Sequence, residues 1–111
     1  MLIHAVGLYV VYGALLIVPA SMAYRWAYQG YAALEARDYD RAASLLRRAV
    51  ALRSGDAASW HNLGLACKAS GDVSAAIAAL EKACSLDPAN EDFQEALNAM
   101  RRKADRPSDP E

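Results

Sequence analysis

Residues 60–67 read Trp-His-Asn-Leu-Gly-Leu-Ala-Cys, and this stretch decides the fold of the chain. Trp60, Leu63 and Gly64 are three and four positions apart, which places them on one face of an α-helix. The tryptophan and the glycine recur with the same spacing earlier in the chain, as Trp26 and Gly30. A sequence period of about 34 residues, as seen here, predicts stacked supersecondary units.

The same period continues beyond each glycine, with Ala42 matching Ala76, Leu46 matching Leu80 and Ala49 matching Ala83. Glycine inside a helix costs about 1 kcal/mol relative to alanine, so we expect Gly30 and Gly64 to serve a close approach between two helices. We predict that the repeats are packed by Trp26, Gly30, Ala42, Leu46, Ala49, Trp60, Leu63, Gly64, Ala76, Leu80, Ala83 and Pro88.

Each unit contains two stretches with apolar residues at helical spacing, as in residues 42–50. Asp38 and Asp72 precede the second helix of each unit and are expected N-caps. Residues 91–104 repeat the apolar rhythm but carry charge on the other face, as expected of the helix that closes an array. The predicted fold class is all-α.

The second copy resembles the tetratricopeptide repeat, in which tryptophan, leucine and glycine are followed by small, large and small residues and then proline. It departs from that pattern at Cys67, where an aromatic residue is usual. In the first copy, Gln29, Ala33 and Ser54 replace leucine, tyrosine and proline. The resemblance covers about residues 23–90 and implies a short α-solenoid. The expected parts are a transmembrane anchor (1–22), two helical hairpins (23–56 and 57–90), a capping helix (91–104) and a flexible tail (105–111).

In the tetratricopeptide repeat family the inner helices line a concave groove that receives peptides from other proteins. The matching positions imply a groove lined by Ala27, Tyr31, Leu34, His61, Leu65 and Lys68. Family members that hold chaperone C-termini through a carboxylate clamp carry lysine and asparagine where this chain has Ala27 and Tyr31. That specialised function is therefore not expected here.

Residues 2–22 form an uncharged apolar stretch, and Arg25 is the first charged side chain. As a helix this stretch would span roughly 31 Å, close to the hydrocarbon core of a bilayer. It predicts a single transmembrane helix. The following residues have the composition found among lipid headgroups, and we assign Tyr24, Arg25, Trp26 and Tyr28 to the membrane interface. Because arginines follow the span and none precedes it, the globular part is expected to be cytoplasmic.

Two other readings of the N-terminal stretch stay open. Small residues at Ser21 and Ala23 are compatible with a signal peptide cleaved after Ala23, which would leave an exported soluble protein. The stretch lacks a preceding lysine or arginine, however, and exceeds the usual signal core. In the second reading, residues 2–22 form a buried helix of a soluble domain.

Composition and motifs argue against several function classes. A net charge of -1 over 111 residues does not suit nucleic-acid binding. Residues 24–53 carry a net charge of +3, whereas residues 54–100 carry -5. Cys67 and Cys84 have no zinc-like spacing, and His4 and His61 are far apart in the sequence. With no phosphate-binding loop and no nucleophile beside an identifiable base, we expect neither a cofactor, a metal nor enzymatic activity.

The sequence therefore predicts a membrane-anchored scaffold or adaptor that contacts another protein and membrane lipid, in the assembly or stabilisation of a membrane protein complex. The alternative is a permanent small accessory subunit of a respiratory, photosynthetic or secretion complex. In that case the small residues Gly7, Gly13 and Ala14 would pack the span against neighbouring helices. A solenoid of this kind usually needs three or more units, so the leading face requires a cover. Lipid headgroups, a second copy in a homo-oligomer or a membrane-protein partner would supply one.

Overall fold

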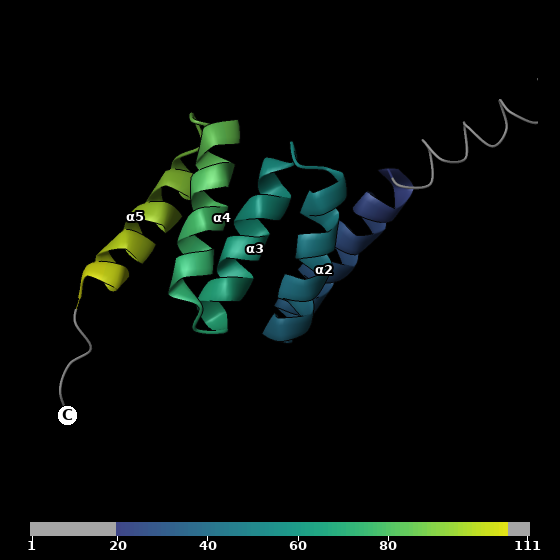
Figure 1. Ribbon diagram of the computed structural model, residues 1–111, viewed down its shortest axis with the longest axis horizontal. Coiled ribbons are helices and arrows are strands. Elements are labelled where there is room, and N and C mark those ends of the chain that lie inside the picture. Colours follow the sequence, from purple (N-terminus) through teal and green to yellow (C-terminus); the bar gives the residue numbers. More distant parts are fainter. Residues whose placement is uncertain (1–19, 107–111) are drawn as a thin grey trace, which may run out of the picture.

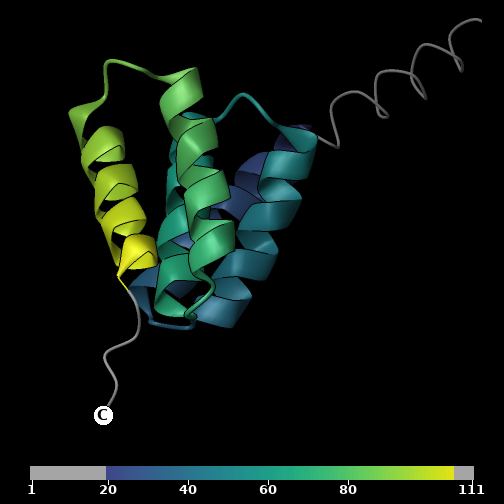
Figure 2. The same ribbon diagram turned by 60° about the vertical axis from the view of Figure 1, so that its left-hand side comes forward.

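The computed structural model describes residues 20–106, which are helical apart from short turns. The chain runs through a helix over residues 20–35, then α2 (Tyr39–Leu52), α3 (Ala57–Ala69), α4 (Val73–Leu86) and α5 (Glu91–Asp105). Consecutive helices from α2 to α5 pack against one another, and Figures 1 and 2 show them standing side by side in a short stack. The predicted all-α solenoid is confirmed in this part of the chain.

One continuous core runs through the stack. Leu46, Leu80 and Met100 are its largest fully buried side chains, and they come from α2, α4 and α5. Of the residues predicted to pack the repeats, the alanines and leucines are buried, whereas Trp26 and Trp60 are half-buried against the core. Pro88 is exposed in the turn between α4 and α5, and its part in repeat packing stays a prediction.

The two predicted glycines lie where two helices approach most closely. A Cβ atom added at Gly64 would stand 2.7 Å from the Leu80 Cγ atom and 3.3 Å from the Ala76 carbonyl oxygen. A Cβ atom added at Gly30 would stand 2.6 Å from the Leu46 Cγ atom. The same contact therefore closes both hairpins, and the partner of each glycine is a leucine that is fully buried.

The turns inside the two hairpins are also copies of each other. The Asp38 amide donates to the Ala33 carbonyl, and at the matching place in the second repeat the Asp72 amide donates to the Cys67 carbonyl, both at 2.9 Å. The residue before each aspartate has a left-handed backbone, with φ of 63° at Arg37 and 88° at Gly71. A side chain in this region costs roughly 1–2 kcal/mol, so the first turn carries a strain that the second avoids by using glycine.

The predicted N-caps are partly correct. Asp38 and Asp72 occupy the N-cap positions of α2 and α4, but only the Asp72 side chain accepts a capping hydrogen bond, from the Ala75 amide at 3.1 Å. Asn90 caps α5 in the same way by accepting from the Phe93 amide at 3.2 Å.

The first repeat helix departs from the predicted boundary at residue 23, because residues 20–22 are already helical. The predicted membrane span over residues 1–22 and the tail over 105–111 fall mostly outside the described residues. Between residues 20 and 106, no helix is long and apolar enough to cross a bilayer.

Replacing Gly64 by alanine is expected to lower the free energy of unfolding by about 1–3 kcal/mol, because Leu80 has no free space into which to move. This loss should exceed the gain of about 1 kcal/mol from the better helix propensity of alanine. Thermal unfolding of the full chain, followed by tryptophan fluorescence, measures the change.

Gly55→Ala is the matched control, since no atom lies within 4 Å of a Cβ added there. Equal stability of the Gly64→Ala and Gly55→Ala chains would show that the close approach at Gly64 is not a constraint.

Candidate protein-binding surfaces

The concave-groove residues of the first repeat come from the helix over residues 20–35. Ala27, Tyr31 and Leu34 follow one another at spacings of four and three, so they share one face of this helix. Leu34 also packs against the core, whereas the Tyr31 side chain is 49 % exposed. Tyr31 is therefore the side chain of this set that is most available to a partner.

The second repeat contributes a set that is less open. His61 and Leu65 on α3 are half-buried, and Lys68 is exposed. The His61 ring stacks on Phe93 of α5, with ring centroids 4.7 Å apart and planes inclined by 29°. His61 thus joins α3 to the closing helix, and one face of its ring is already occupied.

The titration of His61 follows from this position. Burial lowers the pKa of His61 from its usual value of 6.5, and the nearby Asp92 carboxylate opposes that shift to a smaller extent. Since burial disfavours the charged ring, the unfolded chain binds a proton at a higher pH than the folded chain does.

The residues assigned to the membrane interface take part in contacts with α2 and the turn after it. The Arg53 guanidinium lies 4.3 Å from the centre of the Tyr24 ring, and the Arg48 guanidinium lies 5.9 Å from that of Trp26. Tyr28 is 75 % exposed, and Arg25 is exposed as well. These contacts orient Tyr24 and Trp26, and whether lipid surrounds the side chains stays a prediction.

Tryptophan serves a structural role in the second repeat. The Trp60 indole Nε1 donates a hydrogen bond of 2.8 Å to the carbonyl of Ser54, which ties α3 to the turn after α2. Trp26, at the matching place in the first repeat, lies beneath Arg48 instead. The two tryptophans therefore share a position in the repeat and differ in their polar contacts.

The buried cysteines are poor candidates for chemistry. Cys67 and Cys84 are free thiols, and burial is the main cause that raises the pKa of each. A raised pKa keeps the thiol protonated and unreactive at neutral pH. Within residues 20–106 no three side chains of the metal-binding types gather at one point.

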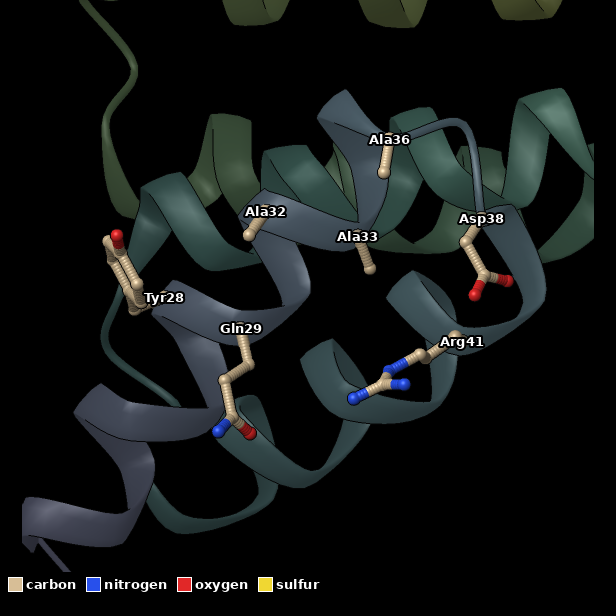
Figure 3. A pocket seen from close by; sticks show the side chains of 7 residues that line it. All are labelled: Tyr28, Gln29, Ala32, Ala33, Ala36, Asp38 and Arg41. Carbon is tan, nitrogen blue, oxygen red and sulfur yellow. The ribbon is translucent and has the colours of Figure 1, made fainter.

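The sequence predicted a leading face that needs a cover, but it did not predict the lining of that face. The structure has a groove of about 300 Å³ there, between the helix over residues 20–35 and the start of α2. We call it the first-repeat groove. Figure 3 shows its lining, which consists of Tyr28, Gln29, Ala32, Ala33, Ala36, Asp38 and Arg41. The alanines at positions 32, 33 and 36 are a signal in the sequence, but alanines at helical spacing are usually taken as core.

Lowering the pH from about 7.5 to about 5.5 is expected to reduce the stability of the folded chain, because protonation of His61 favours the unfolded state below pH 6.5. The loss of stability ends once the pH falls below the pKa of His61 in the folded chain.

The variant His61→Phe serves as the control, because phenylalanine can stack on Phe93 but does not titrate. The melting temperature of this variant should therefore fall less over this pH range. His4 is present in both chains and cancels. Equal pH dependence would contradict the role given to His61.

Comparisons with known proteins place this architecture. A family model described as "Tetratricopeptide repeat" matches residues 29–91, which is more than half of the chain. A solved structure described as "MamA RS-1 ArsTM double mutant" is similar, with a TM-score of 0.69 and 30 % identity over 71 % of this chain. The match covers 45 % of that structure, so this chain spans less than half of its length. No curated protein matches. The chain belongs to the tetratricopeptide repeat family.

Proposed function

We propose that this chain is a membrane-anchored scaffold that holds a client protein during the assembly or stabilisation of a membrane protein complex. Membership of a family of interaction repeats supports the binding role, and the uncharged stretch over residues 2–22 supports the anchor. The proposal assigns no catalytic step to the chain. The client would meet the concave side, where the helix over residues 20–35 and α3 contribute side chains.

The observation that carries the proposal is a row of exposed tyrosines, Tyr24, Tyr28 and Tyr31, which we call the tyrosine stripe. Their side chains are 58 %, 75 % and 49 % exposed. The matching positions of the second repeat hold Ala58, Asn62 and Leu65, so repeat packing does not require aromatic rings there. Tyrosine supplies a large contact area at a small cost in side-chain entropy, which is why it is enriched in interfaces.

The stripe lies close to positive charge. Arg53 covers one face of Tyr24, and Arg25 is exposed on the same helix. The first repeat as a whole is basic, because residues 24–53 carry a net charge of +3. A client segment with aromatic or aliphatic side chains and nearby carboxylates would complement this surface.

The anchor and the stripe support each other physically. The stripe begins just after the predicted span ends, so any client bound there would be held close to the bilayer. Confinement to the membrane raises the effective concentration of a membrane-bound client, which allows a small interface to be useful. A chain with two repeats would gain more from this effect than a long array with a large groove.

Changing Tyr24 and Tyr31 together to serine is expected to reduce recovery of the client at least tenfold, because each change removes an exposed aromatic contact. A tagged chain is purified in mild detergent, and the amount of its main companion is compared with that for the unchanged chain. Leu86→Ser is the control, since this side chain lies on α4 and is 37 % exposed. Undiminished recovery with the tyrosine variant would refute the proposed binding surface.

Replacing Val11 and Leu15 by arginine is expected to release the chain from membranes. Each change places a charge near the middle of the predicted span, which raises the free energy of membrane insertion by about 2.5–3.5 kcal/mol. Membrane pellets washed at alkaline pH are probed for the tagged chain. Ala51→Arg with Ala78→Arg adds the same charge at exposed positions of α2 and α4 and should stay in the pellet. The anchor would be ruled out if the chain with its natural sequence were found in the supernatant. It would also be ruled out if the chain with arginine at positions 11 and 15 stayed in the pellet.

A further inference from the structure

The internal repeat gives the first-repeat groove a direct comparison inside the same chain. Residues that line this groove have counterparts one period later, so Ala33, Ala36 and Asp38 match Cys67, Ser70 and Asp72 of the second repeat. In the second repeat α2 packs against this face, so that Leu63, Ala66 and Cys67 are buried, although a hollow remains beside Ser70. Among residues 20–106, the same surface therefore occurs twice, once with a helix packed on it and once without.

The contacts of α2 in the covered copy are specific. The Ser70 hydroxyl donates a hydrogen bond of 3.1 Å to the Asp40 carboxylate, and an Arg47 guanidinium nitrogen lies 3.6 Å from the Cys67 sulfur. Ala43 lies between these two contacts along α2 and lines the same hollow of about 320 Å³. Asp40, Ala43 and Arg47 are three and four residues apart, so one face of α2 makes these contacts with the second repeat.

The uncovered copy has lost both polar contact points. Ser70 is replaced by Ala36 and Cys67 by Ala33, so the floor of the first-repeat groove is formed by alanines. Suppose that a helix lies in this groove as α2 lies on α3. Its residues at the positions of Asp40 and Arg47 would then face the methyl groups of alanines. Charged side chains would find no hydrogen-bond partner in these two residues, whereas an apolar side chain would bury alanine surface.

The rim of the groove adds a charge that the covered copy lacks. Arg41 stands where the second repeat has Ala75, and Figure 3 shows its guanidinium reaching along the groove toward Gln29. Among residues 20–106, no carboxylate forms an ion pair with Arg41. A helix with a carboxylate on its flank would therefore find a partner at this edge.

The opposite end of the stack does not offer a matching surface. Asn98 of α5 stands at the position of Gly30 and Gly64, and it is exposed. Glu91, Glu95 and Arg102 are exposed at helical spacing from Asn98, so the outer face of α5 is polar and does not present an apolar helix face to the groove of a second copy. This disfavours a second copy as the occupant.

From these observations we propose that the first-repeat groove binds one amphipathic α-helix of another protein. That helix lies as α2 lies on α3. It carries apolar side chains where α2 has Asp40 and Arg47, a small or apolar residue where α2 has Ala43, and a carboxylate on the flank near Arg41. The inference goes beyond the proposed function, because Tyr24 and Tyr31 do not line the groove; Tyr28 alone belongs to both the tyrosine stripe and the groove.

A peptide derived from α2 tests this directly. The probe has the sequence of residues 39–52 with Asp40→Leu, Arg47→Leu, Arg41→Glu and Arg48→Glu, is stapled on its outward face to keep it helical, and carries a fluorophore. Its binding to the full chain in detergent micelles is followed by anisotropy. It should bind at least tenfold more tightly than the same stapled peptide with the unmodified α2 sequence.

Variants of the full chain locate the binding site. Ala36→Trp fills the floor and should weaken binding of the probe at least tenfold, whereas Ala78→Trp at an exposed position of α4 should leave it unchanged. Arg41→Ala should weaken it about two- to fivefold, as expected for an exposed ion pair. Retained far-ultraviolet circular dichroism of each variant confirms that the helices are intact.

Several outcomes would overturn the proposal. Equal affinity of the two peptides, or binding that survives Ala36→Trp, would show that the groove does not select this helix. Absence of binding would also refute it. One cause of such an absence is that residues 1–19 fill the groove themselves, and a disulfide formed between cysteines introduced by Val6→Cys and Ala36→Cys would reveal that case. A dimer of the chain that Ala36→Trp dissociates would identify a second copy as the occupant. Recovery of the client is tested separately, through Tyr24 and Tyr31, which do not line the groove.

Discussion

The close approach of a glycine to a leucine inside each hairpin is the constraint on which the rest of this structure depends. Gly30 admits Leu46, and Gly64 admits Leu80, at distances that leave no room for a Cβ atom. Because each leucine is fully buried by this contact, its helix is fixed in both tilt and register against the first helix of the hairpin. The alanines at positions 42 and 76 sit one turn away and let the helices stay close over their length. The tyrosines, the groove and the half-buried histidine are placed by this arrangement.

Much of the fold could be predicted from the sequence because these close contacts require particular residues. Glycines inside helices are costly, so the recurrence of Gly30 as Gly64, in step with the tryptophans, indicates a constraint that each repeat must satisfy. The bounds of α2 and α4 follow from Asp38 and Asp72 in the same way. Details that depend on local geometry were not predictable: Asp38 stands at an N-cap without capping, and Arg37 takes the left-handed conformation that Gly71 takes in the second copy.

The candidate surfaces were less predictable than the fold, since they depend on residues far apart in the sequence. The stack of His61 on Phe93 joins α3 to α5 across the whole of α4, and no periodic pattern reports a ring contact between different helices. The lining of the first-repeat groove was not predicted, because a sequence does not show whether an alanine is exposed or buried. Comparison of its lining with the covered surface of the second repeat was needed to show that Ala33 and Ala36 stand where polar contacts are made.

The two buried cysteines have a consequence for how motions of this stack can be observed. Cys67 lies beside Arg47 of α2, at the junction of the first and second repeats, whereas Cys84 lies on α4 near Arg101 of the closing helix. Burial shields both sulfurs and raises the pKa of both thiols, so movement of the neighbouring unit is expected to speed their reaction with a thiol reagent. The chain therefore contains one natural reporter at each of its two junctions, and the relative alkylation rates of Cys67 and Cys84 would tell which end of the stack opens first.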